Sequence, residues 1–424
     1  MNEDATIINP AQDSSAAPVS QTERIESIDV LRGFALLGIL VMNIQAFAMP
    51  QAAYFNPTAY GDLTGVNRYV WIAGRLLADQ KFMTIFSLLY GAGIVLMTAR
   101  AGTRSDARRV HYRRMRWLLV IGLLHGHLLW WGDILFHYAV CGMLVYPLRR
   151  QSPRRLLVLG VVLLVAFSAF WGVFGLSFPY WPEEARAKFV ADAWQPPQEK
   201  VDAELATYRG GWLEQMPDRS VTALASETLV LVMWAVWRAG GLMLIGMALF
   251  KKDVFNARRS TRFYVSLIAV AAAVGIPLQA YGISLDFATG WSFRSFFVGF
   301  QLVYWTSIAV GLGYVGAIML VCRTPALRRF TRPFAAVGQT ALTNYLLQTV
   351  ICTSIFYGHG LGWFGSVDRI GQAGVMTGVW AVQLIASPLW LRRYRFGPVE
   401  WAWRSLTYRA RQPMRRSPVP EHAK

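Results

Sequence analysis

The chain has 424 residues, 54% of them hydrophobic, with a mean hydropathy of +0.34 and a formal net charge of +18. In a soluble protein such a charge would indicate nucleic-acid binding. Here the basic residues are confined mainly to segments between long apolar stretches, so the composition excludes a soluble nucleic-acid-binding protein and predicts a polytopic membrane protein.

Ten apolar stretches are long enough, or nearly so, to cross a bilayer as helices. They cover residues 30–50, 82–99, 117–132, 133–148, 156–178, 228–250, 263–285, 296–320, 334–357 and 374–391. We therefore expect an all-α polytopic protein with about ten transmembrane helices. The predicted domains are a disordered tail, two membrane halves separated by a loop, and a basic tail. Their bounds are 1–27, 28–178, 179–227, 228–408 and 409–424.

The distribution of Lys and Arg predicts the orientation. Of these 42 residues, 30 fall in the two tails and the four loops on the same side, and ten fall in the five loops opposite. Because short cytoplasmic loops retain Lys and Arg, both termini are predicted to be cytoplasmic and the long loop external. We expect a multi-pass protein of the cell (inner) membrane, in contact with the lipid bilayer and not with nucleic acid.

Ionisable residues inside a span are energetically costly and are therefore candidates for function. In the first span, Asp29 and Arg32 are three residues apart on one helical face, which predicts a pair at the cytoplasmic edge. This pair is either part of a binding site or an interfacial ion pair. Asn43 lies deeper, and either faces a site or bonds a neighbouring helix. Asp79 precedes the second span at its outer edge.

The densest polar group lies where the third and fourth spans meet. His125 and His127 are two residues apart, so only one of them can face a given cavity. Asp133 and His137 are four apart and are expected to share a face, with one third-span histidine nearby because the turn is short. A His held by an Asp is the arrangement of a general base; the alternative is a hydrogen-bonded network that fixes helix packing. We expect no metal site, because two His so spaced on a helix chelate poorly.

Two further polar features lie in the second half. Arg238 is near the middle of the sixth span, where the cost of its charge favours a binding role unless an acid pairs with it. Thr340, Asn344 and Gln348 recur every four residues on the ninth span. This polar stripe either lines a cavity or holds helices together.

Several chemistries have no motif in the chain. The sequence contains no phosphate-binding loop, no nucleophile elbow and no CxxC motif. The three cysteines lie in spans or at their inner edge, so no structural disulfide is expected. We expect no permanently bound cofactor. The residues thus predict a polar cavity open to the outside with basic groups beneath it, without naming a reaction.

Four blocks of residues resemble the YeiB family of membrane proteins (domain of unknown function 418). They follow one another in order over nearly the whole chain, and as a set they are highly specific. The blocks are Asp29-Val30-Leu31-Arg32-Gly33-Phe34-Ala35-Leu36-Leu37-Gly38-Ile39 with Met42-Asn43-Ile44, Gly132-Asp133-Ile134-Leu135 with Tyr138-Ala139, Ala341-Leu342-Thr343-Asn344-Tyr345-Leu346-Leu347-Gln348, and Phe396-Gly397-Pro398-Val399-Glu400-Trp401 with Trp403-Arg404-Ser405-Leu406-Thr407.

This family resembles a wider group of transmembrane acyltransferases, which includes heparan-α-glucosaminide N-acetyltransferase and the type-three sugar O-acyltransferases. The resemblance implies transfer of an acyl group, expected to be acetyl, from cytoplasmic acyl-CoA as co-substrate to an envelope glycan or lipid. It also implies that basic groups such as Arg32 and Arg238 meet the phosphates of CoA. Asp29, Asn344 and Gln348 complete the expected binding residues.

The resemblance leaves the identity of the base open. The O-acyltransferases have a functional His at the position of Asn43, and an Asn cannot accept a proton near pH 7. The N-acetyltransferase has an Asp that resembles Asp79. The available bases are therefore His125 or His137 with Asp133, or Asp79.

Two other classes of function fit the same residues. The first is a transporter or permease, because five spans followed by five of opposite orientation would form an inverted repeat. The segments 32–38 and 238–244 are faintly alike, as such a repeat would require. The second is a non-catalytic membrane partner of an envelope pathway. The sequence does not indicate an oligomeric state for either class.

Overall fold

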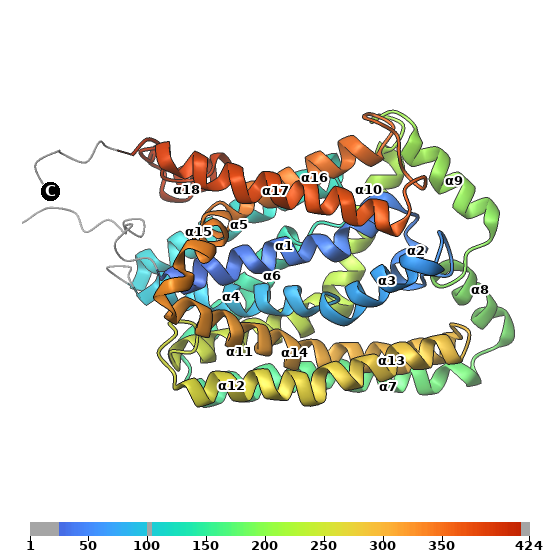
Figure 1. The fold of residues 1–424 in the computed structure, drawn as a ribbon, viewed down its shortest axis with the longest axis horizontal. Helices are drawn as coiled ribbons and strands as arrows, with labels where there is room; N and C mark the ends of the chain where they lie inside the picture. The colour runs from blue at the N-terminus through green and yellow to red at the C-terminus, as the bar shows by residue number, and fades with distance from the viewer. Residues whose placement is uncertain (1–24, 100–103, 417–424) are drawn as a thin grey trace, which may run out of the picture.

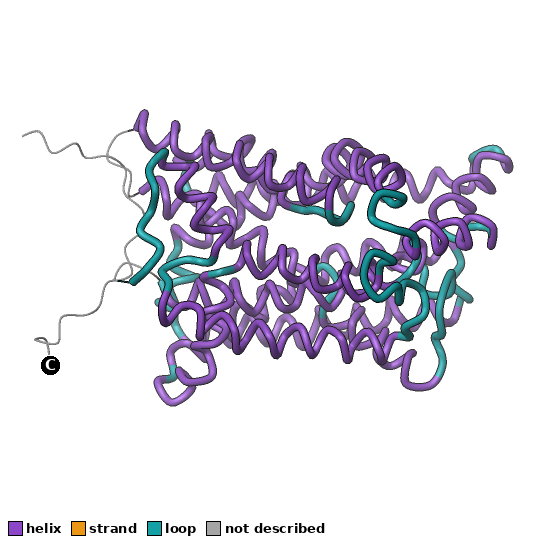
Figure 2. The backbone as a smooth tube through the Cα atoms, turned by 90° about the horizontal axis from the view of Figure 1, so that it is seen from above, coloured by secondary structure: helices purple, strands orange, loops and turns teal. Residues whose placement is uncertain are grey.

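The computed structural model describes residues 25–99 and 104–416. These residues form helices and loops and contain no strand, which confirms the all-α prediction (Figure 2). The predicted disordered tail, except for its last three residues, and the end of the basic tail from 417 onward lie outside the described residues.

The helices follow the apolar stretches of the sequence. The first half contains α1 (Glu26–Ala48), α2 (Ala52–Phe55), α3 (Gly65–Leu77), α4 (Lys81–Ala99), α5 (Arg104–Leu128), α6 (Leu135–Val145) and α7 (Pro153–Ser177). The long loop contains α8 (Glu183–Ala193), α9 (Gln198–Arg209) and α10 (Met216–Ala225). The second half contains α11 (Val236–Lys251), α12 (Thr261–Val270), α13 (Ile276–Ala288), α14 (Phe293–Arg323), α15 (Arg328–Gln339), α16 (Ala341–Phe356), α17 (Arg369–Arg393) and α18 (Pro398–Tyr408).

Short segments of different helical pitch join some of these elements. Two π-helical stretches, Ser226–Ala235 and Ala271–Gly275, connect α10 to α11 and α12 to α13, so that each pair forms one long helix. In the described part of the chain, three 3-10 turns follow or precede other helices: Tyr146–Arg150, Phe178–Tyr180 and Pro325–Leu327.

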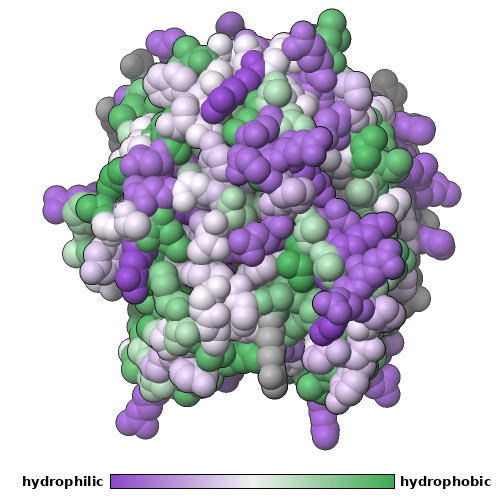
Figure 3. Space-filling view, turned by 90° about the vertical axis from the view of Figure 1, so that its right-hand side faces the viewer, coloured by the Kyte–Doolittle hydropathy of each residue, from purple (hydrophilic) through white to green (hydrophobic). Residues whose placement is uncertain are grey.

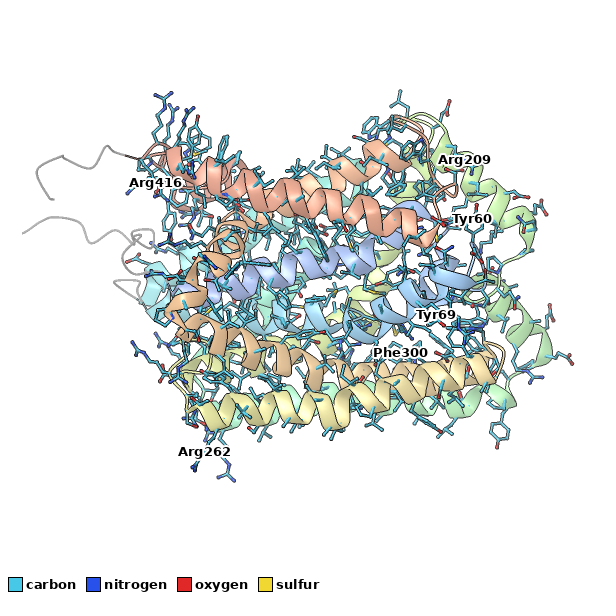
Figure 4. The ribbon with its side chains drawn as sticks, in the orientation of Figure 1. Tyr60, Tyr69, Arg209, Arg262, Phe300 and Arg416 are labelled. Atoms are coloured by element: carbon cyan, nitrogen blue, oxygen red, sulfur yellow. The ribbon has the colours of Figure 1, made fainter. Side chains whose placement is uncertain are left out.

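The long helices run along the longest axis of the molecule and form one bundle (Figure 1). Both ends of the described chain lie at one end of the bundle, together with Arg262 and Arg416 (Figure 4). We call this the basic end. The opposite end, with Tyr60 and Arg209, is called the loop end. Viewed directly, the loop end carries hydrophilic side chains interspersed with apolar ones (Figure 3).

Seven of the described helical stretches are long and apolar enough to cross a membrane, which makes this a multi-pass helical membrane protein. The other three expected spans fall on α5, α6 and α15–α16. Helix α5 has 25 residues but carries many arginines, and α6 has only 11 residues. The break at Thr340 leaves α16 with 16 residues. These three expected spans are therefore not among the seven membrane-length apolar stretches, because their helices are either too short or too rich in charge.

Helices α1 and α11 lie at the centre of the bundle. In α11 every residue from Arg238 to Ala248 is buried, as expected of a helix that is apolar on all sides. In α1, 72% of the membrane-length window is buried, against 22% in Pro153–Tyr180, Thr261–Ala288 and Arg369–Arg393. The outer helices therefore present apolar side chains to lipid, while α1 and α11 pack against protein.

Close packing of α1 against α15 depends on two glycines. A Cβ atom added to Gly33 would lie 1.9 Å from the carbonyl oxygen of Phe334, and one added to Gly338 would lie 1.9 Å from that of Asp29. Both neighbours are backbone atoms, which cannot rotate away. The Arg-Gly pair of the first sequence block thus allows two helices to approach closely, in the manner of small residues at membrane helix interfaces.

Gly33→Ala is expected to destabilise the protein by about 3 kcal/mol or more, because the new methyl group overpacks a rigid backbone contact. Thermal unfolding in detergent measures this. Gly378→Ala is the matched control, since a Cβ at Gly378 meets no atom within 4 Å, and it should unfold at or slightly above the wild-type temperature. Equal melting temperatures for the two variants would contradict the close α1–α15 contact.

The long loop folds as a cap on the loop end. Asn56 donates to the carbonyl oxygen of Trp194 at 3.1 Å, and the Trp194 indole donates to that of Trp291 at 2.9 Å. Farther along, Arg209 donates to the carbonyl oxygen of Phe364 at 2.8 Å. These bonds attach α8 and α9 to both halves of the membrane domain.

The pH dependence of stability should report on this cap. Glu204 of α9 is half-buried and accepts a hydrogen bond from the backbone N–H of Gln51 at 2.9 Å. Burial raises the pKa of the Glu204 carboxyl from 4.5 to about 7. Between these two values the folded protein holds a proton that the unfolded chain has released, so the free energy of unfolding falls as pH rises.

Glu204→Gln should remove that fall, which amounts to about 1 kcal/mol after allowance for solvent screening. The measurement is the difference in unfolding free energy between variant and wild type at the acidic and neutral ends of this window. A difference that does not change with pH would contradict the assignment.

Candidate functional site

A cavity of about 710 Å³ lies beside α1. The α1 residues that line it recur every three or four positions, which places them on one helical face. They are Ile28, Asp29, Arg32, Leu36, Gly38, Ile39, Met42, Asn43 and Ala46. From Ile28 to Ala46 the lining extends for roughly 27 Å at 1.5 Å per residue, most of the length of a membrane-spanning helix.

The charged lining residues are distributed unevenly along this cavity. The arginines are near the basic end, together with two acids that have other partners there; two further aspartates lie toward the loop end. The charged lining residues are Asp29, Arg32, Asp79, Arg114, Asp133, Glu400 and Arg404. The lining is therefore richer in positive charge near the basic end, and the two aspartates toward the other end pair with Arg75 and His125.

At the basic end, Asp29 and Arg32 form the ion pair expected from their spacing, with 3.0 Å between Nη1 and Oδ1. Arg32 is half-buried and also lies 3.5 Å from the carbonyl oxygen of Gly338 on α15. The same pair thus connects α1 to α15 where Gly33 allows close approach. Arg32 remains at the cavity wall, where it can meet an anion.

Glu400 of α18 stabilises the N-terminus of α16 from the side of the cavity. Its carboxylate accepts from the backbone N–H groups of Leu342 and Thr343, at 2.6 and 3.0 Å, and from the Thr343 hydroxyl at 2.5 Å. A carboxylate satisfies the unpaired N–H groups of a helix start and interacts favourably with its dipole. Burial raises the pKa of the Glu400 carboxyl above its ordinary value, and these hydrogen bonds offset only part of that rise. The third and fourth sequence blocks are therefore in direct contact.

The structure places His125 against Asp133. His125 Nδ1 lies 2.7 Å from Asp133 Oδ1, and its Nε2 lies 2.9 Å from the Thr349 hydroxyl on α16. Both ring nitrogens are occupied, and the side chain is 2% exposed. His125 also does not line the cavity. This geometry fixes the α5–α6 connection and leaves His125 poorly placed to accept a proton from a ligand.

The expected pairing of Asp133 with His137 is wrong. Asp133 lies before α6, which begins at Leu135, so the i to i+4 spacing of a helix does not apply to it. Its second carboxylate oxygen accepts from the backbone N–H of Phe136 at 2.8 Å, as an N-terminal cap. The Asp therefore joins His125 and the helix start, and not His137.

His137 has a different environment, and it lines the cavity. Its Nε2 lies 3.0 Å from the carbonyl oxygen of Ser226. Because a carbonyl only accepts, Nε2 carries the hydrogen and Nδ1 carries the free lone pair. Among the described residues Nδ1 has no hydrogen-bond partner and is enclosed by protein. His137 is thus a cavity histidine with an unengaged basic nitrogen, and His111 is a second one, with Nε2 against the Gly142 carbonyl oxygen.

Asn43 and Asp79 also line the cavity toward the loop end. Asp79 is 4% exposed and accepts from Arg75 Nη1, four residues before it. Lys81 nearby donates to the Arg75 carbonyl oxygen at 3.0 Å. Asp79 is therefore charge-paired, which makes it a weaker candidate base than His137.

Arg238 does not reach the cavity lining. It is 1% exposed, and its guanidinium donates to the Tyr304 carbonyl oxygen at 3.1 Å, to Thr84 Oγ1 at 3.3 Å and to Ser307 Oγ at 2.7 Å. The Tyr304 ring lies 4.4 Å from its Cζ atom. Polar neighbours and an aromatic face thus stabilise the charge of Arg238 within the protein. Arg238 is therefore not among the cavity residues, although the sequence favoured it for ligand binding.

The polar stripe of the ninth span joins two helices. Asn344 donates to Thr340 Oγ1 at 2.8 Å and to Ser387 Oγ of α17 at 2.9 Å. Gln348 donates to Gln383 Oε1 of the same helix at 2.9 Å. Neither lines the cavity, so the helix-joining alternative describes this stripe.

Four histidine or charged residues of the cavity lining were not put forward as site candidates from the sequence: His111, Arg114, Glu400 and Arg404. His111 is fully buried, its Nε2 lies 3.1 Å from the Gly142 carbonyl oxygen, and its ring stacks on Tyr146. Arg114 belongs to the arginine cluster that the positive-inside rule already explains. Across residues 25–99 and 104–416, no three His, Cys, Asp or Glu side chains are grouped to hold a metal ion.

Fold and site together define a multi-pass helical membrane protein with a long, charge-polarised internal cavity. The family model described as "Protein of unknown function (DUF418)" matches residues 249–410. The "Uncharacterized protein YeiB" of Escherichia coli (strain K12) is 34% identical over 396 residues, which cover 92% of this chain and 98% of that protein. The chain belongs to the YeiB family.

Two relatives from bacilli also align over most of their length. The "Uncharacterized protein YxaH" of Bacillus subtilis (strain 168) is 29% identical over 427 residues, covering 95% of this chain and 98% of its own. The "Uncharacterized 39.9 kDa protein in amylase 3'region" of Bacillus acidopullulyticus is 26% identical over 398 residues, covering 94% and 97%. These alignments cover more than nine-tenths of the chain and therefore extend over both membrane halves.

Proposed function

We propose that this protein is a transmembrane acyltransferase. It takes an acyl group, acetyl in the first instance, from acyl-CoA at the basic end and transfers it to a hydroxyl or amine of an envelope glycan or lipid. The basic end then faces the cytoplasm and the loop end faces outward, in the inner membrane. With α5, α6 and α15–α16 counted as crossings, the chain spans the membrane ten times and returns both termini to the cytoplasm.

The observation that carries this proposal is the length of the cavity. Its lining runs for roughly 27 Å along one face of α1, from Ile28 to Ala46. A donor and an acceptor that enter from opposite sides of a membrane need one continuous space in which their reacting atoms meet. The polar side chains along the cavity match these two roles. Arginines suit the phosphates of CoA at one end, and the Asn43 amide suits a polar acceptor toward the other.

His137 is the proposed base. Its free Nδ1 accepts the proton of the acceptor hydroxyl or amine as the oxygen or nitrogen attacks the thioester carbonyl carbon. The new ester or amide bond forms, the carbon–sulfur bond breaks, and the proton passes to the leaving thiolate. The hydrogen bond from Nε2 to the Ser226 carbonyl keeps a hydrogen on Nε2, so Nδ1 has a free lone pair before it accepts the proton and again after the proton passes to the thiolate. Because Nδ1 is enclosed, side chains around it must move when the acceptor binds.

A transporter is the second candidate, and the same cavity favours it. The first helices of the two halves, α1 and the helix that contains α11, are both central and largely buried, as an inverted repeat would place them. A transporter would move a small solute through the cavity and would need no base.

Thermal unfolding of the purified protein with acetyl-CoA, free CoA or ATP separates these functions. A ligand that binds only the folded state raises the melting temperature, by an amount that grows with concentration above its Kd. We expect acetyl-CoA and CoA to stabilise the protein and ATP to do so less. No response to any CoA species, together with uptake of a solute into proteoliposomes, would instead establish the transporter.

A further inference from the structure

Arg114 of α5 lies in the cavity wall near the basic end and is half-buried. Its Cζ atom is 4.3 Å from the Trp403 ring centroid, so the guanidinium lies against the face of an indole on α18. Its Nη1 is 3.3 Å from the Met97 sulfur, a weak acceptor. The Trp403 indole in turn donates to the Arg114 carbonyl oxygen at 2.9 Å, which fixes the ring beside it.

No carboxylate neutralises Arg114 within the part of the chain that the structure describes. The two acids of the cavity near this end have other partners, since Asp29 pairs with Arg32 and Glu400 holds the start of α16. Arg404 adds a third guanidinium to the lining. Most buried charges are paired, so an enclosed cation with a sulfur and an aromatic face as neighbours has spare capacity for an anion.

The geometry points to a phosphate-binding subsite at the basic end of the cavity, with Arg114 as its main ligand and Arg32 as the second cation. A guanidinium binds a phosphate through two parallel N–H donors, and stacking on Trp403 restricts the plane of that fork. The phosphate comes either from a soluble ester that enters the cavity or from the headgroup of a membrane lipid. The assignment to the phosphates of CoA rests on the proposed function; the subsite itself does not.

The test uses the full-length protein in nanodiscs of zwitterionic lipid, with binding of CoA and of adenosine 3′,5′-bisphosphate measured by calorimetry and adenosine as the uncharged comparison. We expect both phosphate esters to bind and adenosine to bind far more weakly. Arg114→Gln should weaken phosphate-ester binding by about tenfold or more, which corresponds to 1.4 kcal/mol. Arg114→Lys keeps the charge but not the fork and should retain part of the affinity.

Arg116→Gln is the matched control, because Arg116 is on the same helix, is exposed, and does not line the cavity. It removes the same charge and should leave binding unchanged. Equal weakening by Arg114→Gln and Arg116→Gln would overturn the subsite, as would binding that Arg114→Gln and Arg114→Lys both leave intact. If Arg114→Gln fails to fold, the comparison of Arg114→Lys with Arg116→Gln decides the question.

Nanodiscs that contain phosphatidylglycerol distinguish the two sources of phosphate. If the lipid headgroup is the ligand, the anionic lipid should raise the melting temperature of the wild type but not of Arg114→Gln, and soluble esters should not compete. Binding of either source through Arg114 without any acyl transfer would retain the subsite and remove the proposed function. Acyl transfer that does not depend on Arg114 would retain the proposed function and remove the subsite.

Discussion

His137→Gln is expected to reduce acyl transfer by roughly 10²–10⁴-fold, the usual contribution of a positioned general base. The substitution keeps a side chain of similar length that can still donate to the Ser226 carbonyl, but it removes the basic Nδ1. The protein should remain folded, inserted in the membrane and able to bind CoA. Transfer of radiolabelled acetyl groups by purified protein, with a melting curve on the same sample, measures both properties.

His127→Gln is the control for this result. His127 is half-buried, lies 3.3 Å from Glu227 Oε2, and does not line the cavity. Its replacement should change transfer by less than about threefold. A His137→Gln enzyme that retains more than about a tenth of wild-type transfer would exclude His137 as the base and leave Asp79 and His111 as candidates.

Asp133→Ala is expected to have the largest effect on stability, a loss of about 3–5 kcal/mol. It removes the partner of a buried His125 and the N-terminal cap of α6 in one step. Asp133→Asn should cost less, because an amide oxygen can replace one of the two contacts. His125→Ala should be destabilising to a similar degree, since it leaves Asp133 and Thr349 without their shared partner.

Thermal unfolding in detergent and the yield of folded protein measure this loss. These measurements separate a catalytic role from a structural one, which the sequence could not assign to different residues. His137→Gln should reduce activity without destabilisation, and Asp133→Ala should destabilise the fold. Wild-type melting of Asp133→Ala together with abolished transfer would show that the Asp133–His125 pair is catalytic.

Local spacing explains which contacts the sequence predicted well. Asp29 and Arg32 are three residues apart within one helix, and their ion pair follows from helical geometry alone. The meeting of His125 and Asp133 followed from the short turn between two antiparallel helices. The expectation that Asp133 also shares a helical face with His137 was wrong, because the sequence placed the start of the fourth helix two residues too early.

Contacts between distant segments were beyond what spacing can predict. Glu400 meets Leu342 across 58 residues, and Arg238 meets Tyr304 across 66. Both depend on which helices pack together, and helical periodicity does not contain that information. Arg114 could not be recognised as a cavity residue for another reason. It lies among arginines whose presence the positive-inside rule already explains. The all-helical fold is confirmed, and the ten crossings and cytoplasmic termini stay predictions.

In the proposed function, one cavity connects a donor on one face of the membrane to an acceptor on the other. Proteoliposomes of uniform orientation test it, with acetyl-CoA supplied only on the side of the basic end and an envelope glycan or lipid acceptor only on the side of the loop end. We expect labelled acceptor in this arrangement and none when the donor and the acceptor are exchanged. Transfer only when donor and acceptor share a side, or no transfer to any acceptor despite bound CoA, would contradict it.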